Sequence, residues 1–452
     1  MSDNQQRESF GSKLGLIAAA AGSAVGLGNI WRFPYELGSY GGAAFLIVYL
    51  AFIFVLGIPV MVTEFSIGRH GQANASGSFI KIAPKSPQWS VVGFMGILSS
   101  FMIMTFYSTI AGWTLEYMFN SHGLVAGIMS GEVNSGDYFT NFVAHPWHPV
   151  AWQLAFMAIT AFVILNGVSK GIEASSKILM PLLFVLIIVI CVRSLMLDGA
   201  SAGLEFLFKP DFSKIDASVG LAALGQAFFS LSLGMGALIT YGSYINKQEN
   251  LVNTAFQVSV ADTVVAVLAG VMIFPAVFAF GVEPGSGPSL VYITLPNIFA
   301  EMALGWLWCL VFFLLLTVAA LTSMISLLEA NVVYIAEKFK MNRTVATIVG
   351  SLAVLVIGVP VTLSQGSGAW AEFQIFGLGL FDLMDFLSAK ILMPLGGLLA
   401  VVFVGWGPGK NAFELEISNE GTLKSSAIQF VRAMVKYVAP ALIAVIFVAG
   451  LM

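Results

Sequence analysis

Two apolar segments of the sequence each contain a pair of glycines separated by one residue, Gly26 with Gly28 and Gly234 with Gly236. A glycine inside a helix costs about 1 kcal/mol relative to alanine. Such glycines can serve close helix packing in a membrane. Paired interruptions in the two halves of a chain instead indicate broken helices around a site at the middle of the bilayer. Because both pairs lie among hydroxyl and amide side chains, the pattern favours a binding site.

A broken helix at membrane depth supplies a definite chemistry. Its freed carbonyls and N–H groups are tolerable only where they face a cavity, another protein segment or a ligand. Carbonyl oxygens suit a bare cation, and the N–H groups of a half-helix N-terminus suit a carboxylate.

Several polar side chains lie within apolar segments near these breaks. Asp262 lies about ten residues into its segment, where an aspartate costs about 2.5–3.5 kcal/mol, and function is the default interpretation. Ala319, Thr322, Ser323 and Ser326 follow helical spacing and form one stripe, for which helix packing and cation ligation both remain open. We interpret three other acidic residues in or near such segments as structural, because no break adjoins them: Glu64, Glu116 and Glu329.

Composition identifies the elements that position these groups. The chain has 452 residues, of which 10% are charged and 58% hydrophobic, whereas soluble domains have about 25% charged residues. This composition therefore argues against a soluble enzyme, and a net charge of −4 without a basic cluster argues against a nucleic-acid partner. Cys191 and Cys309 are expected to be buried thiols, and the polar first twelve residues predict no signal peptide.

Apolar runs long enough to cross a bilayer, about 20 residues each, predict an all-α polytopic membrane protein. Eleven transmembrane helices are expected at 14–38, 42–69, 90–119, 149–167, 174–195, 218–244, 252–281, 298–337, 344–364, 374–405 and 428–450. The 298–337 segment is longer than a span requires, so we expect a short lateral helix around Pro296 to Trp306 before it.

The distribution of cations predicts the orientation. With a cytoplasmic N-terminus, external loops hold only Arg193, Lys209 and Lys214, while Arg32 and Lys390 fall at membrane depth and every other Lys or Arg is cytoplasmic. The C-terminus is then external. The expected division is a cytoplasmic segment 1–13, spans 1–5 in 14–195, an external loop 196–217, spans 6–10 in 218–405, a cytoplasmic loop 406–427 and span 11 in 428–452.

Residues 22–34, GSAVGLGNIWRFP, resemble the first-span signature of the neurotransmitter:sodium symporter family. The segment QAFFSLSLG at 226–234, Leu321-Thr322-Ser323, and Tyr107 followed by Gly112-Trp113-Thr114 extend the resemblance along nearly the whole chain. Within this family, the chain resembles the bacterial transporters of leucine and other hydrophobic amino acids. The resemblance implies two inverted five-helix repeats, spans 1–5 and 6–10, with broken helices 1 and 6, plus one extra helix.

The resemblance also implies two Na⁺ ions. The first ion would be bound by Ala24, Asn29, Ser230, Asp262 and the substrate carboxylate, which makes the substrate itself a ligand. The second would be bound by neutral oxygens of Gly22, Val25, Ala319, Thr322 and Ser323. Chloride-dependent relatives carry Asn and Ser where this chain has Asp262 and Ala266, so a fixed carboxylate replaces chloride and no chloride is expected, although Tyr49, Gln226 and Ser230 of the chloride shell are present.

Gly26 stands where monoamine-carrying relatives have Asp, and its small size leaves room for the carboxylate of an α-amino acid. The expected substrate-binding residues are Ala24, Gly26, Leu27, Gly28, Ile103, Tyr107, Phe229, Ser230, Ser232, Met235, Ser323, Ser326 and Leu327. Because the side-chain pocket is mostly apolar, hydrophobic or aromatic L-amino acids are expected.

Charged residues on either side of this site are expected to act as gates. By resemblance, Arg32 and Asp385 form the outer pair under a lid of Tyr107 and Phe229, while Arg7, Tyr244 and Glu337 close the inner side.

The sequence thus predicts a sodium-coupled, chloride-independent symporter working by alternating access in the bacterial inner membrane, among membrane lipids, and not an enzyme. A proton-coupled permease of the same architecture and a non-transporting amino-acid sensor remain open, as do a monomer and a homodimer.

Overall fold

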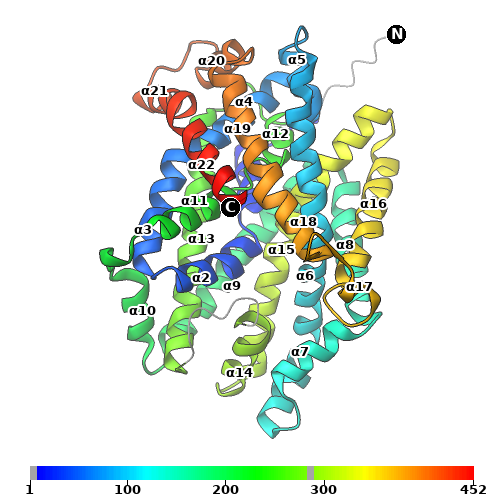
Figure 1. The fold of residues 1–452 in the computed structure, drawn as a ribbon, viewed down its shortest axis with the longest axis vertical. Helices are drawn as coiled ribbons and strands as arrows, with labels where there is room; N and C mark the ends of the chain where they lie inside the picture. The colour runs from blue at the N-terminus through cyan, green and yellow to red at the C-terminus, as the bar shows by residue number, and fades with distance from the viewer. Residues whose placement is uncertain (1–7, 282–289, 452) are drawn as a thin grey trace.

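The computed structural model describes residues 8–281 and 290–451. Within these residues the chain is a bundle of helices with one two-residue pair of antiparallel strands, β1 (Gln374–Ile375) and β2 (Leu378–Gly379). α5 (Ala75–Ile82) and α20 (Lys410–Ile417) lie at one end of the bundle, and α7 (Ser135–Ala144) and α14 (Leu295–Ala300) lie at the opposite end (Figure 1). The loops predicted to be cytoplasmic and external are therefore separated by the length of the spans.

Nine of the predicted spans are continuous helices in the described part of the chain, long and apolar enough to cross a bilayer. The single-helix spans are α8 (His148–Leu165), α13 (Leu251–Ala279), α15 (Gly305–Phe339) and α16 (Arg343–Leu363). Pro87–Ser130 consists of η3 (Pro87–Trp89) and α6 (Ser90–Ser130), and Val168–Leu195 consists of η4 (Val168–Glu173) and α9 (Ala174–Leu195). Ala43–Gly71 consists of α3 (Ala43–Phe52), η2 (Ile53–Gly57) and α4 (Ile58–Gly71). Leu380–Gly405 consists of α18 (Leu380–Asp385), η7 (Phe386–Leu392) and α19 (Met393–Gly405), and Ser426–Leu451 consists of α21 (Ser426–Ala433), η8 (Met434–Val438) and α22 (Ala439–Leu451).

The other two predicted spans are broken, as the glycine pairs indicate. Span 1 consists of α1 (Lys13–Ala24) and a second helical segment, Gly28–Ser39, bent by 50° relative to it. Span 6 consists of α11 (Ala217–Ser230) and α12 (Ala237–Gly242), separated by residues 231–236. The expected all-helical membrane fold is confirmed. The described residues contain nine continuous candidate spans and the bent span 1, and α11 and α12 lie where span 6 is expected, with a break between them.

The short helix expected around Pro296 to Trp306, ahead of the long span, is present as α14. It ends at Ala300, and the span α15 begins at Gly305, after Leu304 adopts a left-handed φ of 58°. One predicted boundary is wrong. The span expected at 374–405 begins at Leu380, because residues 374–379 form the β1–β2 turn instead. Apolar composition alone does not reveal this turn.

The remaining elements are short and connect the spans. They are α10 (Ala200–Phe208), η5 (Phe212–Lys214), η6 (Leu290–Thr294) and α17 (Ala369–Glu372). Helix α1 packs against α15, α13 and α9, and α12 packs against α4, so both breaks are enclosed by other helices. The freed backbone groups therefore face protein and cavities, as a membrane setting requires.

Candidate functional site

The two breaks use glycine for different physical reasons. In span 6, Gly234 and Gly236 have φ angles of 77° and 71°, a left-handed conformation that glycine adopts without steric cost. In span 1, Gly26 is needed for space: a Cβ there would lie 2.3 Å from Ser323 Oγ and 2.9 Å from the Tyr107 hydroxyl. Similarly, a Cβ on Gly28 would lie 3.2 Å from the Phe229 ring.

A cavity of about 30 Å³ lies between the breaks. All the predicted substrate-binding residues except Leu27 and Ser326 line it, together with Ser23. Leu27 instead lines a larger cavity on the outer side, and Ser326 lies behind the wall, accepting a hydrogen bond from Ser23 Oγ at 2.8 Å. The structure therefore gathers residues from spans 1, 3, 6 and 8 around one small space.

Polar groups suited to a carboxylate lie at the edge of this cavity. The Leu27 N–H donates to the Tyr107 hydroxyl at 3.0 Å, which places both groups beside Gly26 and Gly28. Ser232 donates its hydroxyl to the Ser23 carbonyl across the two breaks at 2.8 Å. The lining also includes the apolar side chains of Ile103, Met235 and Leu327.

The oxygens predicted for the second sodium ion lie close together. Thr322 Oγ1 lies 3.3 Å from the Val25 carbonyl and 3.0 Å from that of Ala319, and Ser323 Oγ lies 3.4 Å from the Gly22 carbonyl. Ligands of a hard cation such as Ca²⁺ lie about 2.3–2.6 Å from the ion, so neighbouring ligands at right angles are about 3.3–3.7 Å apart. Two of the three distances fall in this range, and the Thr322–Ala319 distance is shorter. All five oxygens are uncharged, which suits a monovalent cation.

The residues predicted for the first sodium ion form a buried polar cluster. The Asp262 carboxylate accepts hydrogen bonds from Asn29 Nδ2 at 2.7 Å and from Ser230 Oγ at 2.9 Å. The Tyr49 hydroxyl donates to the same carboxylate at 3.3 Å. Asn29 Oδ1, the oxygen predicted to bind the ion, accepts a hydrogen bond from the Gly26 N–H and so faces the break. The amide nitrogen of Asn29 faces Asp262. Rotation of the amide by 180° would direct Oδ1 toward Asp262 instead.

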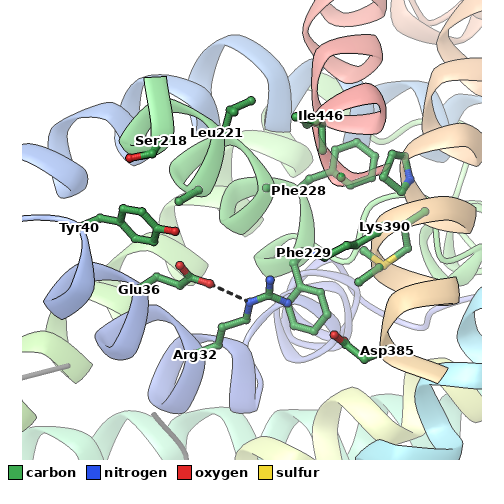
Figure 2. Close-up of a pocket in the computed structure, with 17 residues that line it drawn as sticks. Arg32, Glu36, Tyr40, Ser218, Leu221, Phe228, Phe229, Asp385, Lys390 and Ile446 are labelled. Carbon is green, nitrogen blue, oxygen red and sulfur yellow. Dashed lines mark ion pairs between the residues drawn. The ribbon is translucent and has the colours of Figure 1, made fainter. Parts of the chain in front are cut away.

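Arg32 and Asp385, the predicted outer gate pair, do not form an ion pair in the structure. Arg32 Nε lies 3.5 Å from Glu36 Oε1, and the guanidinium lies 4.7 Å from the Phe229 ring centroid, while Asp385 is not within ion-pair distance (Figure 2). Glu36 lies one helical turn after Arg32, which explains the local pairing. The two predicted partners nevertheless line the same outer cavities, one of about 280 Å³ and one of about 340 Å³ that also contains Lys390.

The proposed lid separates the outer cavity from the deep cavity. Gly28, Tyr107 and Phe229 line both the 280 Å³ outer cavity and the 30 Å³ central cavity. Movement of these two aromatic rings would therefore change access from the outer side.

On the inner side, Arg7 lies outside the described residues, and the other two predicted gate residues contact different helices. The Tyr244 hydroxyl donates to Glu329 Oε1 at 2.6 Å, and Glu337 Oε2 accepts from the backbone N–H and the side-chain amide of Asn74, each at 2.8 Å. A cavity of about 630 Å³ adjoins Tyr244 and Glu337.

Two acidic residues have closer links to the site than the sequence indicates. Glu64 Oε1 accepts the Gly234 N–H at 2.6 Å, which stabilises the broken segment of span 6. Glu329 pairs with Arg343 at 2.6 Å as well as with Tyr244. Neither lies near a break in sequence, so no local signal reveals these contacts. Within the described part of the chain, Glu116 has no hydrogen bond with either break; its carboxylate accepts hydrogen bonds from the Tyr138 hydroxyl and from Trp152 Nε1.

Comparison with known proteins identifies this arrangement. The Sodium:neurotransmitter symporter family profile matches residues 7–127 and 144–452, nearly the whole chain. The chain belongs to this family. It is therefore a multi-pass membrane transporter that depends on sodium, and not an enzyme.

Individual relatives agree with this membership. A Bacillus subtilis protein named as the sodium-dependent transporter YhdH is 37% identical over 98% of this chain and 97% of its own length. A Haemophilus influenzae sodium-dependent transporter is also 37% identical, over 99% of both chains. The crystal structure of MhsT in complex with L-phenylalanine is 46% identical, with a TM-score of 0.88 over 98% of this chain and 100% of that one.

Proposed function

We propose that the protein is a sodium-coupled, chloride-independent symporter of hydrophobic and aromatic L-amino acids that works by alternating access. The observation that carries this proposal is the central cavity, whose lining combines polar groups with apolar side chains. The polar groups include the backbone of Gly26, which has no side chain, and the Tyr107 hydroxyl, which accepts the Leu27 N–H beside the cavity. An α-carboxylate fits the first set of groups and an apolar side chain fits the second. The likeness to MhsT, whose structure holds L-phenylalanine, supports the same substrate class.

The size of the cavity supports a site that expands around its substrate. A volume of about 30 Å³ corresponds to about two water molecules, since one needs about 10–15 Å³. Met235 is unbranched and flexible, and Phe229 borders the outer cavity, so rotation of these side chains would admit a larger group. Larger cavities on the outer and inner sides, about 280 and 630 Å³, support alternating access.

We infer two sodium ions, at the sites around Asp262 and around Thr322. The oxygens near Thr322 are all neutral, so they suit a monovalent cation, which needs no charged ligand. Asp262 supplies a negative charge near the first sodium ion. We also place the chain in the bacterial inner membrane with a cytoplasmic N-terminus and an external C-terminus, as the positions of the cations favour.

Transport into liposomes tests this function. With sodium outside and potassium inside, labelled L-phenylalanine should accumulate above its external concentration, and replacing external sodium with potassium should abolish the accumulation. Unlabelled leucine, methionine and tryptophan should compete, because the lining is apolar, whereas glutamate and lysine should not.

Other outcomes would contradict the proposal in distinct ways. Accumulation driven by a pH gradient in potassium would indicate a proton-coupled permease. Saturable binding without uptake would indicate a sensor, and stronger competition by glutamate or lysine than by leucine would refute the pocket assignment.

Thr322→Val removes one hydroxyl from the second set of oxygens while preserving the shape of the side chain. A polar contact to a charged group is worth about 1.5–3 kcal/mol, so the sodium concentration for half-maximal uptake should rise about tenfold. Thr317→Val is the matched control, since Thr317 lies on the same helix but bonds to Thr114 and Phe313. Equal sodium dependence in the two variants would remove Thr322 from the site.

A further inference from the structure

A cluster of charged and polar side chains lies at the α5–α20 end of the bundle, apart from the substrate and sodium sites. We name it the Glu416 cluster; its members are Arg69, His70, Lys247, Glu416 and Asn419. It joins three segments that are distant in sequence: the end of α4, residues 243–250 after α12, and α20 with the turn that follows it.

Arg69 is the centre of this cluster and is 1% exposed. Its Nε donates to Glu416 Oε2 at 2.5 Å, and its Nη2 donates to the Glu416 carbonyl at 2.5 Å and to Asn419 Oδ1 at 2.9 Å. Its Nη1 donates to the carbonyls of Glu249 at 2.6 Å and Asn246 at 3.5 Å. A guanidinium has five N–H donors, so these contacts use its full capacity to tie α4 to both other segments.

The Glu416 carboxylate binds side chains from the other two segments. Its carboxylate accepts from Arg69, from His70 Nδ1 at 3.1 Å and from Lys247 Nζ at 2.6 Å. Burial by itself would raise the pKa of Glu416, but the hydrogen bonds from His70 and Lys247 and the charge of Arg69 outweigh it and lower the pKa to about 2. Because a depressed pKa keeps the carboxylate charged until the pH falls toward that value, the cluster stays intact in any ordinary transport assay.

The end of α4 and the inner half of span 6 form one unit. A Cβ on Gly68 would lie 1.9 Å from the Ile239 carbonyl oxygen, and a Cβ on Gly242 would lie 2.7 Å from the Phe65 carbonyl oxygen. The backbones of α4 and α12 are thus in direct contact, because Gly68 of α4 and Gly242 of α12 carry no side chain. A displacement of α12 therefore displaces the end of α4 and, with it, Arg69.

Helix α20 is held to the inner end of span 10. The Gly409 N–H donates to the Phe403 carbonyl at 3.0 Å, and a Cβ on Gly409 would lie 2.4 Å from the Phe403 ring. Span 10 then runs as continuous helix from Gly405 back to Leu380 and carries Asp385 near its outer end. The Glu416 cluster therefore connects the inner half of span 6 to the helix that borders the outer cavity.

We propose that the Glu416 cluster is a link that makes the inner half of span 6 move together with span 10, which keeps the cytoplasmic side closed while the outer side is open. Glu416 is a positioning residue in this account, since it lies away from the substrate and ion sites. The inference goes beyond the proposed function. It rests on the proposed alternating access and orientation but not on which amino acid is carried.

The same helix provides a matched control. Glu414 also pairs with an arginine, Arg432, but both side chains are partly exposed, 32% and 47%, and Arg432 lies in α21 rather than in the span 6 unit. An exposed ion pair contributes little, about 0–1 kcal/mol. Glu414→Gln should thus remove a comparable charge pair without releasing the link.

Cysteine labelling in sodium alone tests the proposal. Ala336→Cys places a reporter in the inner cavity of about 630 Å³, and its rate of reaction with a maleimide is measured in purified protein without amino acid. Glu416→Gln should raise this rate about fivefold or more, the lower end of usual coupling between sites, and Glu414→Gln should leave it unchanged. Lys247→Met, which removes one donor at a half-exposed position, should give an intermediate rate.

Parallel samples that lack Ala336→Cys exclude unfolding as the cause. Cys191 and Cys309 are buried, at 4% and 0% exposure, so they react only if the helices separate. Equal rates for Glu416→Gln and Glu414→Gln would overturn the proposal. The proposal would also be overturned if Cys191 and Cys309 react faster in Glu416→Gln than in the unmodified protein while the Ala336→Cys reporter reacts no faster in Lys247→Met. That result would mean that Glu416→Gln separates the helices rather than releasing the link. Failure of L-phenylalanine uptake in the unmodified protein would instead refute the proposed function alone.

Discussion

Replacing Gly26 with alanine should reduce L-phenylalanine uptake about a hundredfold. The new Cβ would lie 2.3 Å from Ser323 Oγ and 2.9 Å from the Tyr107 hydroxyl, so one or both side chains must move. Overpacking of this kind costs about 1–3 kcal/mol, and the upper value corresponds to about a hundredfold. Equilibrium binding of labelled L-phenylalanine and initial uptake rates in liposomes measure the effect.

The Gly26 variant should also lose affinity for sodium. Ser323 Oγ lies 3.4 and 3.3 Å from the carbonyls of Gly22 and Val25, so rotation of this hydroxyl away from the new methyl group would remove it from the proposed second sodium site. Gly220→Ala is the matched control, because a Cβ there meets nothing within 4 Å and its helix is part of span 6. Uptake within twofold of the unmodified protein would show that no substrate carboxylate lies beside Gly26.

Replacing Asp262 with asparagine should raise the sodium concentration for half-maximal uptake tenfold or more in chloride-free medium. The carboxylate accepts three hydrogen bonds, from Asn29, Ser230 and Tyr49, and it provides the negative charge expected near the first sodium ion. Contacts with a charged group contribute about 1.5–3 kcal/mol each, and 1.4 kcal/mol corresponds to tenfold. Sodium titrations of uptake in gluconate salts measure the change.

Chloride provides the control for Asp262. Uptake by the unmodified protein should be nearly the same in chloride and gluconate, because the carboxylate is already present. The double change Asp262→Asn with Ala266→Ser should recover part of its sodium affinity in chloride but not in gluconate. A severalfold loss of uptake by the unmodified protein in gluconate would contradict the assignment of Asp262.

The sequence by itself determined the helical membrane-spanning fold, the two breaks and most residues that line the central cavity. These features are local: hydropathy marks a span, and Gly26, Gly28, Gly234 and Gly236 mark where a helix is weakened. The residues expected around the substrate lie together because each belongs to a segment next to a break or on one face of a span.

Only the tertiary structure decided how distant segments meet. It showed that Gly26 is needed for space while Gly234 is needed for its φ angle, that Glu64 binds the break in span 6, and that Arg32 pairs with Glu36 rather than Asp385. The physical reason is that hydropathy and helical periodicity do not fix the rotation of one helix against another. Contacts such as that of Arg69 with Glu416, 347 residues apart, depend on that packing.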